Sequence, residues 1–173
     1  ILSGVYNGYT TGTPITFVIR NADTRSRDYG EMASTARPGH ADWAAQCKYH
    51  GFQDFRGGGH FSGRITAALT VAGALCREAL RAKGIRIAAH IAACAGISDR
   101  AFGDLIADMD KLDTLDFAVL DEPAGQAMQQ AILAAKAEGD SVGGVLETAV
   151  VGLPCGVGEP FFDSVESRLA HIL

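Results

Sequence analysis

The chain has 173 residues, of which 47% are apolar and 20% are charged, and its formal net charge at pH 7 is −5. This composition is typical of a single globular domain with a full core, and it excludes an intrinsically disordered chain. The acidic balance argues against a nucleic-acid partner, because no broadly basic surface would offset the repulsion from phosphates.

The first third of the chain predicts one strand and two polar loops. Residues 4–12 form a polar, Thr- and Gly-rich connection, and the apolar run at 14–20 predicts a strand. Residues 24–36 are charged and lack periodicity, so a loop is expected there. A glycine-rich loop over 37–64 then leads into a helix predicted from about Ser62, its cap, to Lys83, with Gly84 as its stop.

The rest of the chain alternates between strands and helices. A buried strand is predicted over 85–97, with Ile85, Ile87, Ala89, Ile91 and Ala93 on one face and with His90 and Cys94 on the other. A short helix over 102–109, a helix opened by Asp121-Glu122-Pro123 and a strand over 142–152 follow. A second glycine-rich loop at 154–160 precedes a last amphipathic helix from Phe161 onward. The chain is therefore α/β or α+β.

The four cysteines are Cys47, Cys76, Cys94 and Cys155, and no two of them are close in sequence. This spacing favours neither a zinc site nor a disulfide framework, so no metal is expected. Cys76 and Cys94 lie in apolar runs and are expected to pack as small hydrophobic side chains. Without an apolar run of transmembrane length or a signal-peptide pattern, we expect a cytoplasmic protein.

The loop at 37–64 carries most of the chain's concentrated polar chemistry. Its glycines let backbone N–H groups approach a ligand, and the following helix adds a partial positive charge, which favours a small anionic ligand. The Gly57-Gly58-Gly59 run alone is a weak signal, because it has neither dinucleotide-binding spacing nor a phosphate-binding lysine. These glycines are therefore equally compatible with two other interpretations, a plain flexible turn and a nucleotide-binding domain of another class.

A histidine in this loop has neighbours suited to acid–base chemistry. His40 alone is more often structural, but Arg37 precedes it by three residues and Asp42 follows it by two. Arginine binds phosphate and carboxylate groups, and histidine transfers protons near neutral pH. His90 is expected in the core, and the aspartates between 104 and 116 are expected on a solvated face.

Two motifs in this loop resemble those of the chorismate synthase family. They are Arg37-Pro38-Gly39-His40-Ala41-Asp42 and, after Lys48-Tyr49, Arg56-Gly57-Gly58-Gly59-His60-Phe61-Ser62-Gly63-Arg64. Family members typically show Arg-Pro-(Ser or Gly)-His-Ala-Asp and then Arg-Gly-Gly-Gly-Arg-Ser-Ser-Ala-Arg-Glu-Thr. Matches at 8–29, 139–144 and 156–161 extend the resemblance over essentially the whole chain, in order.

The resemblance implies a fold and an activity. The fold would be α+β, with alternating layers of helices and antiparallel or mixed sheet in a β-α-β-α sandwich, and residues 1–173 would be the central part of one such domain. The activity would be that of a carbon–oxygen lyase of the shikimate pathway, which supplies aromatic amino acid biosynthesis. It eliminates phosphate from 5-enolpyruvylshikimate 3-phosphate to give chorismate. The resemblance also implies reduced FMN as cofactor, NADPH as a candidate reductant of the flavin, and a homotetramer.

The resemblance also assigns roles to individual residues. His40 matches a family histidine that acts beside the flavin, and Arg37 and Arg64 match positions that hold the substrate's anionic groups. His60, Phe61 and Ser62 match the segment that contacts FMN. This sequence departs from the family pattern at His60, Phe61 and Ile65, where an arginine, a serine and a glutamate are usual; Phe61 has no side-chain hydrogen bond to donate.

The chain also lacks the family's Gly-Glu-Ser-His opening and its later flavin contacts, so it is expected to be truncated at both ends and inactive by itself. The function is therefore assigned to the parent protein. The alternative is a non-catalytic anion-binding fragment or scaffold domain of the same fold.

Overall fold

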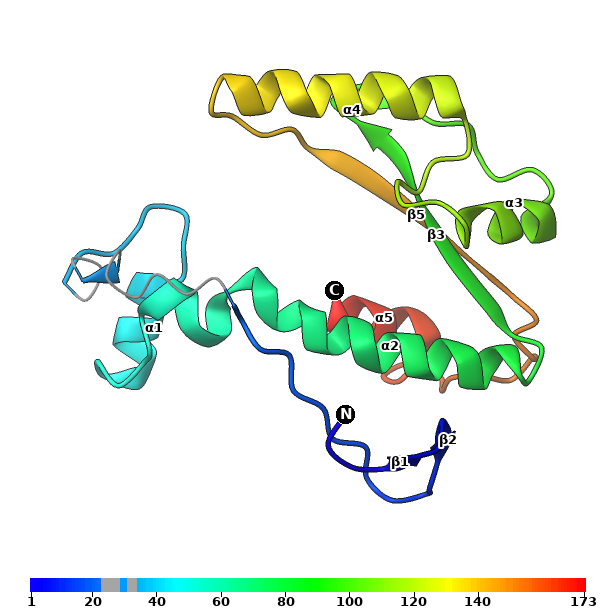
Figure 1. The fold of residues 1–173 in the computed structure, drawn as a ribbon, viewed down its shortest axis with the longest axis horizontal. Helices are drawn as coiled ribbons and strands as arrows, with labels where there is room; N and C mark the ends of the chain where they lie inside the picture. The colour runs from blue at the N-terminus through cyan, green and yellow to red at the C-terminus, as the bar shows by residue number, and fades with distance from the viewer. Residues whose placement is uncertain (23–28, 31–33) are drawn as a thin grey trace. The chain divides into compact units, whose positions relative to one another are not determined.

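The computed structural model describes residues 1–22, 29–30 and 34–173. The chain divides into two compact units, Ile1–Leu75 and Cys76–Leu173, and each is described by itself. Most of the loop predicted over 24–36 lies outside the described residues. Figure 1 shows a mixed α+β chain, which confirms the predicted fold class. None of the described helices is long and apolar enough to cross a membrane.

The first unit contains little regular structure before its helices. Its elements are β1 (Val5–Tyr6), β2 (Tyr9–Thr10), α1 (Asp42–Tyr49), the 3₁₀ helices η3 (Arg56–Phe61) and η4 (Gly63–Ile65), and the start of α2 (Thr66–Arg81). The polar connection predicted over 4–12 is in fact the β1–β2 hairpin. Asn7 and Gly8 form its turn with φ values of 48° and 81°, the left-handed pair that tight hairpins require.

The strand predicted over 14–20 is wrong. Within the described residues, this segment makes one isolated antiparallel bridge, between Thr16 and Ser3. The side chains of Val18 and Ile19 are 59% and 55% exposed. A strand needs a ladder of backbone hydrogen bonds to a neighbour, and an apolar run alone does not supply one.

Helix α2 follows the predicted boundaries closely. Ser62 caps η4, because its Oγ accepts a hydrogen bond from the backbone N–H of Arg64 at 3.3 Å, and α2 continues from Thr66 to Arg81. Gly84 follows with a φ of 80° and ends the helical run as predicted. No α2 residue is buried, so the expectation that Cys76 packs inside is wrong: its side chain is exposed.

The second unit is built on a three-stranded antiparallel sheet. The strand order is β4 (Ile97–Ser98), β3 (Arg86–Cys94), β5 (Gly144–Val151) (Figure 1). The unit also contains the end of α2 and the helices α3 (Leu105–Leu112), α4 (Glu122–Ala137) and α5 (Val165–Ile172). The register places His90 of β3 opposite Glu147 of β5, and it shifts between Ile91 and Ala93. The strands predicted at 85–97 and 142–152 are thus confirmed, with shorter bounds.

The core of this unit lies between the sheet and α4. Cys94, Val119 and Met128 form the buried cluster, with Ile91 and Ile132 packed against it. Helix α4 begins as predicted: Asp121 caps it by accepting from the Ala124 N–H at 3.1 Å, and Pro123 lies in the first turn.

The predicted alternation of the two β3 faces holds only as far as Ile91. His90 and Cys94 are its most buried side chains, at 1% and 7% exposure, whereas Ala89 is exposed. The register shift between Ile91 and Ala93 places Cys94 on the same face as Ile91, which packs against the cluster of Cys94, Val119 and Met128, while His90 lies on the other face. Cys94 and His90 are therefore core residues, as expected for each individually.

The solvated face predicted for the aspartates between 104 and 116 is wrong for Asp108. This residue is 6% exposed and accepts hydrogen bonds from Arg100 Nη1 at 2.9 Å and from the Gly103 N–H at 2.8 Å. Asp104 instead caps α3 through the amides of Ile106 and Ala107. Helix α5 starts after Ser164, so Phe161 lies outside it and is 90% exposed.

Candidate active site

Three residues of the first glycine-rich loop form a compact ionic cluster. Asp42, the first residue of α1, accepts on Oδ2 from the backbone N–H and the Nε of Arg37, at 2.9 and 2.8 Å. Its Oδ1 accepts from Arg37 Nη2 at 2.8 Å and lies 2.8 Å from His40 Nδ1. The structure therefore brings together Arg37 and His40, two of the predicted site residues, through Asp42.

The protonation of this cluster follows from its contacts. The hydrogen bonds from Arg37 hold the pKa of the Asp42 carboxyl far below its usual range, and the same bonds raise the pKa of Arg37. An ionised carboxylate only accepts hydrogen bonds, so His40 Nδ1 donates to Asp42 Oδ1. Arg37 Nη2 and His40 Nδ1 lie 3.1 Å apart because both donate to Asp42 Oδ1. In the neutral ring, Nε2 then carries no hydrogen, and it lies 3.3 Å from Arg37 Nη2.

The Gly57–Gly59 run packs directly against His40. Gly58 has a φ of 85°, and a Cβ built on it would lie 3.0 Å from His40 Nε2. The run itself adopts left-handed φ values inside η3, which glycine accepts without a steric cost. The glycines therefore let backbone reach the histidine ring where any other residue would crowd it.

Arg64 is held by the same loop. Its Nη2 donates to the Gly57 carbonyl at 2.8 Å, and its Nε donates to Ser62 Oγ at 3.1 Å. A Cβ on Gly57 would collide with Arg64 Nη2, so this contact depends on glycine as well. The Arg64 guanidinium is thereby oriented by neutral groups, and no carboxylate of residues 1–22, 29–30 or 34–173 forms an ion pair with it.

An open groove of about 590 Å³ lies beside Arg64. Its apolar lining residues include Phe17, Ile19 and Ile65, and its polar lining residues are Arg20, Asn21, Ser62 and Arg64. The combination of an apolar wall with guanidinium and hydroxyl donors suits a flat ligand that carries an anionic group.

The predicted flavin-contacting segment divides between two places. Ser62 lines the groove, whereas Phe61 lines a separate cavity of about 290 Å³, and its ring lies 6.0 Å from that of Tyr49. The backbone of His60 belongs to η3, and its side chain lies outside the described part of the chain. Sequence reasoning gave no role to Arg20, and it treated Asp42 only as a neighbour of His40.

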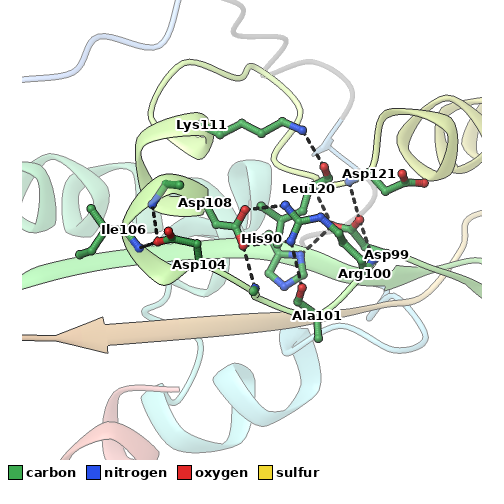
Figure 2. Close-up of polar contacts among 12 residues, drawn as sticks. His90, Asp99, Arg100, Ala101, Asp104, Ile106, Asp108, Lys111, Leu120 and Asp121 are labelled. Carbon is green, nitrogen blue, oxygen red and sulfur yellow. Dashed lines mark hydrogen bonds and ion pairs between the residues drawn. The ribbon is translucent and has the colours of Figure 1, made fainter.

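A second polar cluster is buried in the other unit (Figure 2). His90 Nδ1 lies 2.8 Å from Asp99 Oδ2, and His90 Nε2 lies 2.8 Å from Glu147 Oε2. Asp99 also accepts from the N–H groups of Leu120 and Asp121, at 2.6 and 2.8 Å. Burial raises the pKa of Asp99, but the Leu120, His90 and Asp121 hydrogen bonds outweigh it and lower the pKa overall. These contacts tie β3, β5 and the start of α4 together, a structural role.

Comparison with known proteins gives one consistent result. The family described as chorismate synthase matches residues 1–173. Chorismate synthases of Syntrophobacter fumaroxidans and Korarchaeum cryptofilum are 45% and 42% identical over 173 and 174 residues, which cover 100% of this chain and 48% of each relative. That of Chitinophaga pinensis is 46% identical over 171 residues, 99% of this chain and 43% of the relative. The chain spans about half the length of the curated relatives it matches. Since the family match covers every residue, this chain belongs to the chorismate synthase family.

Proposed function

We propose that the protein carrying this chain is a chorismate synthase, a carbon–oxygen lyase of the shikimate pathway. It converts 5-enolpyruvylshikimate 3-phosphate to chorismate. The C6–H and C3–O bonds break, a carbon–carbon double bond forms, and inorganic phosphate leaves. The observation that carries the proposal is the Arg37–His40–Asp42 cluster on its glycine loop, in a chain of this family.

The charges of the site suit this substrate, which has two carboxylates and a phosphate. The two arginines predicted to bind it differ in their surroundings. Asp42 offsets the charge of Arg37 and occupies its Nε and Nη2, so Arg37 has Nη1 for a substrate anion. Arg64 is oriented by Ser62 and the Gly57 carbonyl, neither of which is charged. Arg64 therefore exerts the stronger attraction on an anion.

We assign the proton transfer to His40. Asp42 fixes the tautomer in which Nδ1 carries a hydrogen, so Nε2 is the basic nitrogen. The ionised Asp42 also stabilises the ring when Nε2 is protonated. His40 can thus hold a proton beside the reacting groups and release it on turnover.

The groove residues fit the family's cofactor. Phe17, Ile19 and Ile65 supply an apolar wall for an aromatic ring system, and Ser62 and Arg64 supply donors for anionic or carbonyl oxygens. When bound there, reduced FMN would supply electron density to the breaking C–O bond, in a reaction with no net redox change. NADPH as its reductant, a cytoplasmic location and a homotetramer belong to the same proposal.

The proposal is tested on the parent protein with 5-enolpyruvylshikimate 3-phosphate and reduced FMN. Chorismate and phosphate should appear in equal amounts, and neither should form without the flavin. Anion binding without turnover would instead favour the alternative, a non-catalytic scaffold of the same fold. The 173-residue chain assayed in parallel should be inactive and should bind FMN weakly, because it spans about half the length of its relatives. Chorismate formation by the 173 residues would contradict that expectation.

A further inference from the structure

We propose that Arg20 is a second anion-binding residue of the groove and that it shares one phosphate group with Arg64. The identification of that phosphate as one carried by substrate or flavin rests on the proposed function. The binding of phosphate by the two arginines does not.

The first step is the pairing of the other arginines. Among the nine arginines that the structure describes, seven form ion pairs with a carboxylate: Arg37, Arg56, Arg77, Arg81, Arg86, Arg100 and Arg168. Each of the seven has an aspartate partner, at N–O distances from 2.5 to 3.5 Å. In an acidic chain of net charge −5, carboxylates are plentiful, and pairing is the rule.

The second step concerns the two described arginines that do not form such an ion pair. Arg20 and Arg64 have no carboxylate partner within the described part of the chain, and both line the 590 Å³ groove. They come from segments far apart in sequence, one before α1 and one at the start of η4–α2. Tertiary structure has therefore placed on one concave surface two guanidinium groups that have no carboxylate partner among the described residues.

The third step is electrostatic. Two like charges on a partly apolar surface repel each other, and this repulsion falls when an anion binds between them. A single exposed arginine does not indicate an anion site, because water solvates its charge. Guanidinium groups present several N–H donors to one oxyanion, and phosphate offers enough oxygens for two arginines together. Ser62 adds a hydroxyl on the same surface.

The test is a titration of the ¹⁵N-labelled chain with inorganic phosphate at low ionic strength, followed by NMR. In the unmodified chain, the Arg20 and Arg64 Nε–H signals and the Ser62 amide should shift together, with one dissociation constant. Arg20→Gln and Arg64→Gln should each weaken binding about five- to tenfold, the loss of one charge-assisted contact at an exposed site. Arg20→Lys should retain most of the affinity. Arg168→Gln, which removes an exposed, Asp163-paired arginine in the other unit, is the matched control and should leave it unchanged.

Several results would overturn the proposal. One is an unchanged phosphate affinity in Arg20→Gln while Arg64→Gln binds more weakly. Another is a phosphate titration that leaves the Arg20 side-chain signal of the unmodified chain in place, a readout that does not depend on any variant folding. An Arg64→Gln variant with unaltered affinity would also contradict it, because the two arginines are proposed to share the anion.

Two further experiments determine whether the bound phosphate belongs to the flavin or to the substrate, independently of whether the two arginines bind phosphate. In the parent protein, Arg20→Gln should lower the preference for FMN over riboflavin if the groove holds the flavin phosphate. It should lower the preference for shikimate 3-phosphate over shikimate if the groove holds the substrate phosphate. If the parent protein shows no lyase activity and the NMR result stands, the proposed function fails and the role of Arg20 survives.

Discussion

His40 Nδ1 lies 2.8 Å from Oδ1 of Asp42, the oxygen that also accepts from Arg37 Nη2. The carboxylate therefore does two things at once: it orients the imidazole, and it offsets the charge of the neighbouring guanidinium. The cluster is built by residues no more than five positions apart, which explains why a short motif identifies it.

The first prediction is that His40→Ala in the parent enzyme lowers kcat about 10²–10⁴-fold, the usual contribution of a general acid or base. The melting temperature should change little, because the ring is partly exposed and Asp42 keeps its hydrogen bonds to Arg37. Oxidised FMN should still bind. Turnover and thermal unfolding are measured on the same preparation, with His171→Ala in α5 as the control. A lower melting temperature with near-normal kcat in the folded fraction would assign His40 a structural role instead.

A second prediction concerns Arg64→Ala. Its guanidinium lines the groove and has no carboxylate partner in the part of the chain that the structure describes, so its loss should raise the apparent KM for the substrate about tenfold or more. The fold should survive, because the lost contacts are exposed hydrogen bonds to Ser62 and Gly57. Steady-state kinetics and circular dichroism provide the measurements. Unchanged kcat and KM would remove Arg64 from the substrate site.

The third prediction is that Gly58→Ala damages the site while Gly63→Ala does not. An alanine at position 58 must adopt a φ of 85° and place its Cβ 3.0 Å from His40 Nε2, so the loop or the ring has to move. Gly63 has open space around its Cβ position and serves as the matched control. We expect kcat of the parent enzyme to fall in the first variant only. Equal activities would show that the glycine loop tolerates a side chain beside His40.

The fourth prediction is a loss of stability in acid that depends on Asp99. Its pKa is lowered in the folded chain, so the unfolded chain binds the proton first as pH falls. The stabilisation from Asp99 is therefore complete above the ordinary carboxyl pKa of about 4, and it declines as the pH drops below that value toward the folded pKa. Chemical unfolding of the chain between pH 7 and pH 3 measures this. Asp99→Asn should flatten the dependence, and Asp163→Asn, at an exposed pair, should not.

Sequence reasoning predicted correctly the helix ends that are marked by residues close to them in sequence. Helix α4 begins where Asp121 and Pro123 predict, and α2 starts after Ser62 and is followed by Gly84, because caps and stops act within a few residues. The β1–β2 hairpin was missed even though Asn7-Gly8 is a strong turn signal, because its strands are only two residues long and too short to show an alternating pattern.

The parts that could not be predicted depend on distant partners. The apolar run at 14–20 reads as a strand, yet only Thr16 makes a bridge in the described residues. The placement of Cys94 on the Ile91 face of β3 depends on the register shift between Ile91 and Ala93, which the alternation of residue types does not reveal. For the site, the resemblance gave the local motif, whereas the meeting of Arg20 and Arg64 in one groove is a tertiary fact with no signal in the spacing.

The Asp99 carboxylate also bears on the order of folding. It binds His90, Leu120 and Asp121, which are 9, 21 and 22 residues away, whereas the His90–Glu147 contact closes a separation of 57 residues. Closing a longer loop costs more chain entropy, so the Asp99 contacts are expected to form first and β5 to dock last. Substitution of Glu147 should then speed unfolding and leave the refolding rate nearly unchanged, whereas substitution of Asp99 should slow refolding, as stopped-flow measurements can determine.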